Sequence, residues 1–201
     1  MRRLLRCSLA AVCALTLTLA GAAGAAAQCA IGSSMPAASQ QMPNATGAAA
    51  SLSSLAGDNA TVVIFWSNQC PWTKKYEQRV LDLASKYDGQ GGQFVLVNAN
   101  STSDFPQESL SAIKEQASGY SMPYLKDQGG QLADAFGAKR TPHVFVYDGQ
   151  GTLAYTGAID DSPGDPSAVN KPYLDNVLEA LTSGSTPSTT KTNAFGCVLK
   201  N

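Results

Sequence analysis

A buried strand that passes directly into an amphipathic helix constrains the fold of this chain more than any other feature. Residues 61–66 are a continuous run of β-branched and aromatic side chains, which is typical of a strand buried on both faces. After this run, apolar residues recur every four positions, at Tyr76, Val80 and Ala84, as on one face of a helix. Cys70 and Pro71 therefore lie at the start of a helix, where the missing N–H of proline costs nothing.

The same alternation continues along the chain. Apolar β-branched runs recur between stretches of helical period, and Gly-Gln-Gly separates two of these runs as in a hairpin. This order predicts an α/β domain. We expect further strands at residues 93–98, 141–148 and 152–157, and helices at residues 110–117, 131–136 and 174–181.

Residues 1–27 have the pattern of an export signal. A basic start precedes an apolar stretch and a small-residue cleavage site that ends at Ala27. We therefore expect a periplasmic or secreted product. No later segment reaches the ~18 apolar residues that a membrane span requires, so we expect no stable membrane span.

The mature chain is expected to be one mildly acidic domain. Loss of the three arginines in the signal leaves 11 basic against 15 acidic residues, a formal charge of about −4 that argues against a nucleic-acid partner. We predict an irregular leader at residues 28–60, a core at residues 61–182 and a flexible Ser/Thr/Pro/Gly-rich tail at residues 183–201.

Three cysteines remain after the signal is removed, namely Cys29, Cys70 and Cys197. An odd number requires one free thiol or an intermolecular partner. The helix start beside Cys70 favours its thiolate and predicts a pKa below ~8.5. Lys74 and Lys75 add to this effect. The alternative is an inert cysteine that fills a small apolar site.

Residues 65–77, which hold Cys70, resemble the active-site strand, loop and helix of thioredoxin-like redoxin domains, related to the alkyl hydroperoxide reductase and thiol-specific antioxidant group. Residues 31–36, 136–142, 155–161 and 196–200 resemble further segments of that family in the same order. The resemblance implies a thioredoxin-like fold, with a central mixed β-sheet flanked by helices. It places Cys70 in an environment formed by Trp66, Ser67, Pro71, Trp72, Thr73, Thr141 and Pro142.

The chain departs from two patterns of that family. Thr73 replaces the second cysteine of C-x-x-C, so a neighbouring dithiol is excluded. In the peroxiredoxin pattern Ser67 can serve as the hydroxyl residue, but Val63 replaces the proline. The resemblance also implies that Pro142 is cis opposite Cys70, which would let the backbone at Thr141 pair with an extended substrate.

The resemblance implies an exported thiol-dependent oxidoreductase, in which Cys70 acts on a protein or small-molecule disulfide or on a hydroperoxide. The reductant is not identified. A thiol peroxidase proper and a non-catalytic partner-binding module remain as alternatives. No cofactor is expected. No metal site is expected either, because no cluster of His or Cys accompanies Asp160 and Asp161.

Cys197 can be interpreted in two ways. A flexible tail of this length reaches about 20 Å, which would let Cys197 act as the thiol that resolves Cys70. Alternatively, a structural Cys29–Cys197 bridge would tie the two ends of the chain and leave Cys70 alone. The sequence leaves both pairings open.

Overall fold

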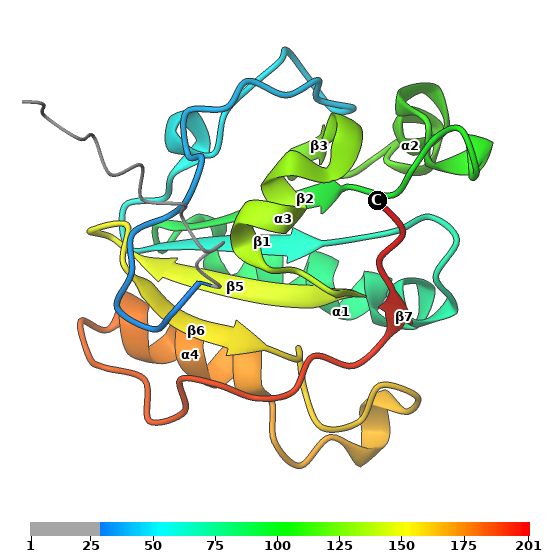
Figure 1. Ribbon diagram of the computed structural model, residues 1–201. Coiled ribbons are helices and arrows are strands. Elements are labelled where there is room, and N and C mark those ends of the chain that lie inside the picture. Colours follow the sequence, from blue (N-terminus) through cyan, green and yellow to red (C-terminus); the bar gives the residue numbers. More distant parts are fainter. Residues whose placement is uncertain (1–28) are drawn as a thin grey trace, which may run out of the picture.

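The computed structural model describes residues 29–201, so the predicted export signal lies outside the described residues. Its centre is a mixed five-stranded sheet with the strand order β3-β2-β1-β5-β6 (Figure 1). The central strand β1 pairs in parallel with β2 and antiparallel with β5. The strands are β1 (Ala60–Phe65), β2 (Gly92–Asn98), β3 (Tyr124–Lys126), β5 (His143–Asp148) and β6 (Leu153–Gly157).

Helices cover both faces of this sheet. In Figure 1, α1 and α4 lie behind the sheet and α3 lies in front of it. The α/β fold and its mixed sheet, predicted from the sequence, are thus confirmed. The helices are α1 (Pro71–Asp88), α2 (Leu110–Gln116), α3 (Gln131–Phe136) and α4 (Tyr173–Thr182), with short 3-10 turns η1 (Ser53–Leu55), η2 (Pro106–Glu108), η3 (Gln128–Gly130) and η4 (Pro166–Ala168).

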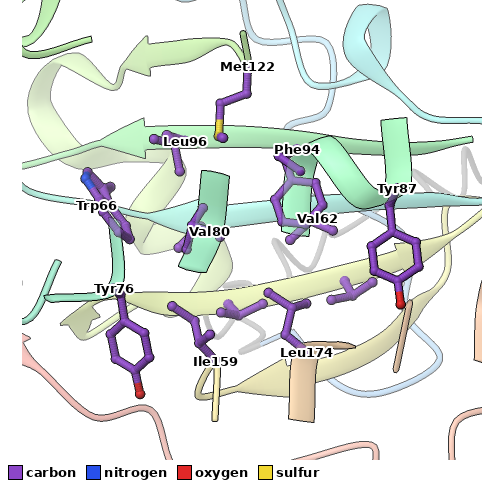
Figure 2. Packing of buried hydrophobic residues seen from close by; sticks show 14 of the residues in the cluster. Val62, Trp66, Tyr76, Val80, Tyr87, Phe94, Leu96, Met122, Ile159 and Leu174 are labelled. Atoms are coloured by element: carbon purple, nitrogen blue, oxygen red, sulfur yellow. The ribbon is translucent and has the colours of Figure 1, made fainter. Parts of the chain in front are cut away.

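Strand β1 is buried on both faces because it separates two apolar cores. Val62 and Ile64 point into the core beneath α1 and α4, whereas Val63 and Phe65 point into the core beneath α3. Figure 2 shows the first core, in which the Val62 side chain lies among residues from α1, β2 and α4. Burying each such side chain contributes about 1.5–3 kcal/mol, which fixes β1 and hence the loop that follows it.

Residues 29–59 cover the α3 face and one edge of the sheet. Met42 and Leu52 are buried in the core of that face. The backbone N–H of Ala45 donates to the Tyr124 carbonyl, and the N–H of Lys126 donates to the Pro43 carbonyl. This segment therefore pairs edge groups of β3 that would otherwise lack hydrogen bonds.

Two short strands differ from what the sequence predicts. The run at residues 141–148 splits at Pro142, which has no N–H to donate, into β4 (Arg140–Thr141) and β5. The second short strand, β7 (Cys197–Val198), pairs antiparallel with β4. Within residues 29–201, no helix combines the length and the apolarity needed to cross a membrane.

Candidate active site

Cys70 lies at the turn between β1 and α1, as the sequence predicts. It is the N-cap residue of α1, and Pro71 occupies the first helical position. Its side chain is only 2% exposed. The Cys70 N–H donates to the hydroxyl of Ser67 over 3.2 Å, which closes the loop upon itself. The unpaired N–H groups of α1 therefore lie at the end of the helix where Cys70 is the N-cap.

Cys70 forms a disulfide with Cys197, and the two Cα atoms are 5.9 Å apart. The partners are separated by 127 residues in sequence. Cys29 is free and half-buried, with its sulfur 3.6 Å from the Tyr147 hydroxyl. Of the two pairings that the sequence left open, the structure therefore contains Cys70–Cys197. Burial raises the pKa of the Cys29 thiol, although the Tyr147 hydrogen bond opposes this.

The Thr141–Pro142 peptide bond is cis, as the family resemblance implied. The Thr141 carbonyl oxygen lies 3.0 Å from the Cys70 sulfur, so this loop contacts Cys70. Thr141 is paired with Cys197 in the β4–β7 ladder. The backbone edge expected to receive an extended substrate is therefore occupied by the chain's own C-terminal segment.

The C-terminal segment (residues 183–201) packs along the domain rather than extending from it, which differs from the flexible tail that its composition predicts. The Arg140 guanidinium donates to the Gly196 carbonyl over 2.9 Å, and the Leu199 N–H donates to the Lys139 carbonyl over 3.0 Å. Gly196 has a φ of +153°, and a Cβ there would collide with the Thr141 carbonyl. A glycine is thus required where the segment crosses β4.

The side chain of Thr73 fixes the Cys70 loop. Thr73 is fully buried, and its hydroxyl lies 2.5 Å from the Ser67 carbonyl and 2.6 Å from the Cys70 carbonyl. The residue that replaces the second cysteine of C-x-x-C therefore holds the turn by hydrogen bonds. The second sulfur comes instead from β7.

A buried carboxylate beneath the loop was not predicted from the sequence. Glu108, at the end of η2, accepts hydrogen bonds from the Ser67 hydroxyl, the Asn68 and Gln69 N–H groups and the Asn98 amide. The Asn100 amide donates to it as well, over 3.1 Å. Ser67, Cys70, Glu108, Thr141 and Cys197 line one small cavity of about 80 Å³. Nothing in the irregular stretch around Glu108 signals this role.

The surroundings of Glu108 keep it ionised. Burial alone would raise its pKa, but hydrogen bonds from Ser67, Asn98, Asn68 and Asn100 outweigh it, so the pKa lies below its ordinary value. The buried Lys126 amine donates to the Asn98 side chain and to the Asn100 carbonyl. Burial lowers the pKa of Lys126, and the nearby carboxylates Glu108 and Asp127 oppose this change.

The two predicted tryptophans have separate roles, and the single histidine of the sequence, His143, was not among the predicted site residues. Trp66 is buried in the core beneath α1 (Figure 2). Trp72 packs edge-to-face against Phe195 of the C-terminal segment, with ring centroids 4.8 Å apart. His143 contacts the Thr156 hydroxyl, and burial with the nearby Lys191 lowers its pKa to about 4. His143 is therefore neutral near pH 7.

The aspartates at 160 and 161 differ from each other. Asp160 is buried and pairs with Arg79 at 2.5 Å, while the Tyr76 hydroxyl also donates to it. Asp161 accepts backbone N–H bonds from Asn170 and Lys171, as in a turn. Both carboxylates are thus engaged in holding the chain.

Solved structures of similar proteins share this fold. An uncharacterized conserved protein from Geobacillus kaustophilus is 29% identical, with a TM-score of 0.80 over 87% of this chain and 93% of that one. A hypothetical protein from Sinorhizobium meliloti 1021 is 33% identical, with a TM-score of 0.77 over 85% of this chain and 94% of that one.

A secreted disulfide oxidoreductase from Mycobacterium tuberculosis is 18% identical, with a TM-score of 0.54 over 71% of this chain and 96% of that one. At this identity the likeness shows the thioredoxin-like fold alone. No curated protein matches the sequence.

The family comparison agrees with the site. The model of the AhpC/TSA family matches residues 31–156, a range that holds Cys70, Thr73 and Pro142. This match covers more than half of the chain. The protein, whose first helix begins at a cysteine opposite a cis proline, thus belongs to the AhpC/TSA family of redoxins.

Proposed function

We propose that this protein is a two-cysteine thiol–disulfide oxidoreductase, in which Cys70 and Cys197 alternate between a dithiol and an internal disulfide. One observation carries the proposal. A cysteine at the start of α1 is bonded to a cysteine on the strand that pairs with β4, beside cis-Pro142. The second thiol that Thr73 does not supply is thereby provided by β7.

The reaction follows from ordinary thiol–disulfide exchange. In the reduced protein, the Cys70 thiolate attacks one sulfur of an external disulfide, which forms a mixed disulfide and releases one substrate thiolate. The Cys197 thiolate then attacks the Cys70 sulfur and releases the second substrate thiolate. Two electrons pass from the protein to the substrate, and the Cys70–Cys197 disulfide is formed.

The Cys70 loop supports disulfide exchange better than peroxide reduction. The one hydrogen of the Ser67 hydroxyl is donated to Glu108 over 2.5 Å. Toward Cys70 this hydroxyl is an acceptor, because it receives the Cys70 N–H. Since Glu108 is ionised and can only accept, Ser67 has no hydrogen left to donate to a peroxide oxygen.

We also propose that the protein acts outside the cytoplasm, where such a disulfide persists. The basic, apolar and small-residue order of residues 1–27 supports this, and so does the pairing of cysteines in the mature part. The N-terminal sequence of protein recovered outside the cytoplasm should begin near Gln28. An N-terminus at Met1 in that fraction would contradict export by a cleaved signal.

The test is stopped-flow oxidation of the reduced mature Cys29→Ser protein, by oxidised glutathione and separately by hydrogen peroxide. Thiols are counted by mass after each reaction. We expect oxidised glutathione to consume two thiols and to form Cys70–Cys197, and to react about tenfold faster than it does with the single remaining thiol of a Cys70→Ser control. Cys197→Ser should stop at a glutathione adduct on Cys70.

Two outcomes would contradict the proposal. Faster oxidation by peroxide than by oxidised glutathione, with sulfenic acid on Cys70 of Cys197→Ser, would assign a peroxidase instead. Two thiols left intact by both oxidants would favour a binding module.

A further inference from the structure

The two sulfurs of the disulfide are not equally accessible. Cys70 is 2% exposed, because it lies beneath the Thr141 carbonyl and the loop that Ser67 closes. Cys197 is only half-buried, and its neighbour Val198 is 62% exposed. A thiolate that attacks a disulfide must reach one of its sulfurs from solvent. In the oxidised protein, access therefore favours Cys197.

The stability of the departing thiolate also favours attack on the Cys197 sulfur. Attack on Cys197 expels Cys70 as a thiolate at the start of α1, where the helix N–H groups and dipole stabilise negative charge. Attack on Cys70 would instead expel Cys197, which is a residue of the short strand β7 and not the N-cap of a helix. The thiol of lower pKa leaves faster. Access and leaving group thus favour the same position by separate arguments.

Exposed apolar side chains flank Cys197. Among residues 29–201, three large hydrophobic side chains are exposed, and two of them are Phe195 at 46% and Val198 at 62%. Trp72 lies against Phe195. Apolar side chains gathered around an accessible sulfur are typical of a surface that receives a protein partner. We call this surface the Cys197 face and define it by Trp72, Lys75, Arg140, Phe195 and Val198.

The Cys197 face is basic although the protein as a whole is slightly acidic. The Lys75 amine lies 5.1 Å from the Trp72 ring centre, and the Arg140 guanidinium binds the Gly196 carbonyl. Further exposed cations in the same segments are Lys74, Lys139 and Lys200. Of the nearby carboxylates, Asp160 is paired with Arg79, and Glu77, Asp134 and Asp161 offset only part of the positive charge. A partner with acidic residues around its thiol fits this charge.

We propose that the oxidised protein is reduced by a dithiol protein with an apolar, acid-rimmed surface, which docks on the Cys197 face and attacks Cys197. This inference rests on the proposed function and names the partner of the same site. The partner thiolate bonds to the Cys197 sulfur, the Cys70–Cys197 bond breaks, and its electron pair stays on Cys70. The second partner thiolate then attacks its own mixed-disulfide sulfur and releases the Cys197 thiolate, which takes up a proton from water.

The position of attack is tested with reduced glutathione as the probe. Oxidised Cys29→Ser protein is mixed with glutathione, quenched within the first turnover with N-ethylmaleimide, and mapped by peptide mass. We expect glutathione on Cys197 and maleimide on Cys70, in about tenfold excess over the opposite pattern. Glutathione on Cys70, or on both cysteines equally, would overturn the proposal.

The docking face is tested with two synthetic dithiol peptides, identical except that aspartates in one are lysines in the other. The acidic peptide should reduce the protein about fivefold faster at low salt, and added salt should remove this difference. Val198→Ser should slow reduction by the acidic peptide more than it slows reduction by dithiothreitol. Equal rates for the two peptides, or equal slowing of peptide and dithiothreitol, would refute the docking face.

Failure of this inference is distinguishable from failure of the proposed function. If reduced protein exchanges with oxidised glutathione but the oxidised protein is attacked at Cys70, the proposed function holds and the inference fails. If Cys70 and Cys197 do not exchange with oxidised glutathione at all, the proposed function itself fails.

Discussion

The two irregular ends of the domain are attached in different ways. The N-terminal segment, residues 29–59, inserts Met42 and Leu52 into the core beneath α3, where both side chains are almost completely buried. The C-terminal segment buries one side chain, Leu199, at the edge of the same core, and is otherwise held by the β4–β7 pairing, by hydrogen bonds and by the Cys70–Cys197 disulfide. Its Phe195 and Val198 side chains stay exposed.

This difference separates a structural attachment from a chemical one. Apolar burial does not depend on the oxidation state of the surroundings, so the N-terminal segment should stay in place in every redox state. A segment held by a disulfide loses its covalent attachment when two electrons are added. The same kind of irregular sequence can therefore be permanent cover at one end and a reactive element at the other.

Among the changes that test this comparison of the two ends, reduction of the Cys70–Cys197 disulfide should have the largest effect on stability. Breaking a disulfide that spans 127 residues should lower the free energy of unfolding by about 4 kcal/mol, because the unfolded chain gains conformational freedom. Urea unfolding of Cys29→Ser protein with and without dithiothreitol measures this. Cys197→Ser should be insensitive to dithiothreitol, whereas equal midpoints for oxidised and reduced Cys29→Ser protein would show that the disulfide does not hold the segment.

Truncation of a buried side chain in the N-terminal segment should have the next largest effect on the free energy of unfolding. Leu52→Ala removes a fully buried side chain and should cost about 3 kcal/mol, through lost burial and the cavity left behind. The loss should be the same in oxidised and reduced protein. A loss that depends on dithiothreitol would break the comparison, since it would couple the two ends. Leu55→Ala, which alters a partly buried residue nearby, is the matched control.

Glu108→Gln should have a smaller effect that depends on pH. The C-terminal segment is tied to the Glu108 network through the Lys200 N–H, which donates to Asn100. Loss of the ionised acceptor should cost about 2 kcal/mol near pH 7. The folded-state pKa of Glu108 is lowered, so its stabilisation is present above the unfolded pKa and lost as pH falls through the folded pKa.

Urea unfolding at a series of pH values between neutral and acid tests this prediction. The stability difference between wild type and Glu108→Gln should shrink toward acid. The difference should also appear as faster proteolysis of the C-terminal segment in the variant. A difference that is constant with pH would mean that the pKa of Glu108 is the same in the folded and unfolded states.

Cys29→Ser should have the smallest effect. Cys29 is half-buried and makes only weak sulfur contacts, so the change in stability should be about 0.5 kcal/mol or less. The Cys70–Cys197 exchange rate should not change.

In reduced wild-type protein, burial should shift the pH midpoint of iodoacetamide labelling of Cys29 above that of Cys70. Labelling of Cys29 at the lower pH would reverse the assignment of the reactive thiol.

The long helices and strands could be predicted because their apolar residues recur at a regular spacing. The apolar run of β1 and the four-residue spacing in α1 are enough, from the sequence alone, to place Cys70 at a helix start. Strands β3 and β7 have three and two residues, which is too short to display a period. Their pairing depends on neighbours that are distant in sequence.

The site could be predicted only in part for a similar reason. Cys70, Thr73 and Pro142 belong to local motifs, so their positions follow from the sequence. The partner of Cys70 does not, because chain length allowed Cys197 to reach either Cys70 or Cys29. Glu108 lies in an irregular stretch, and its role arises only when the loop, β2 and η2 meet. Long-range contacts thus decided what local pattern could not.

The span of the disulfide also governs what a protease can release. Because the bond joins Cys70 to Cys197, the chain between them forms a closed covalent ring. A single cut within that ring leaves both pieces joined in the oxidised protein, whereas the same cut after reduction separates them. A cut at an exposed loop residue of the ring, such as Lys139, therefore releases a fragment only after reduction. Electrophoresis of trypsin-nicked protein, with and without dithiothreitol, would display the two outcomes side by side.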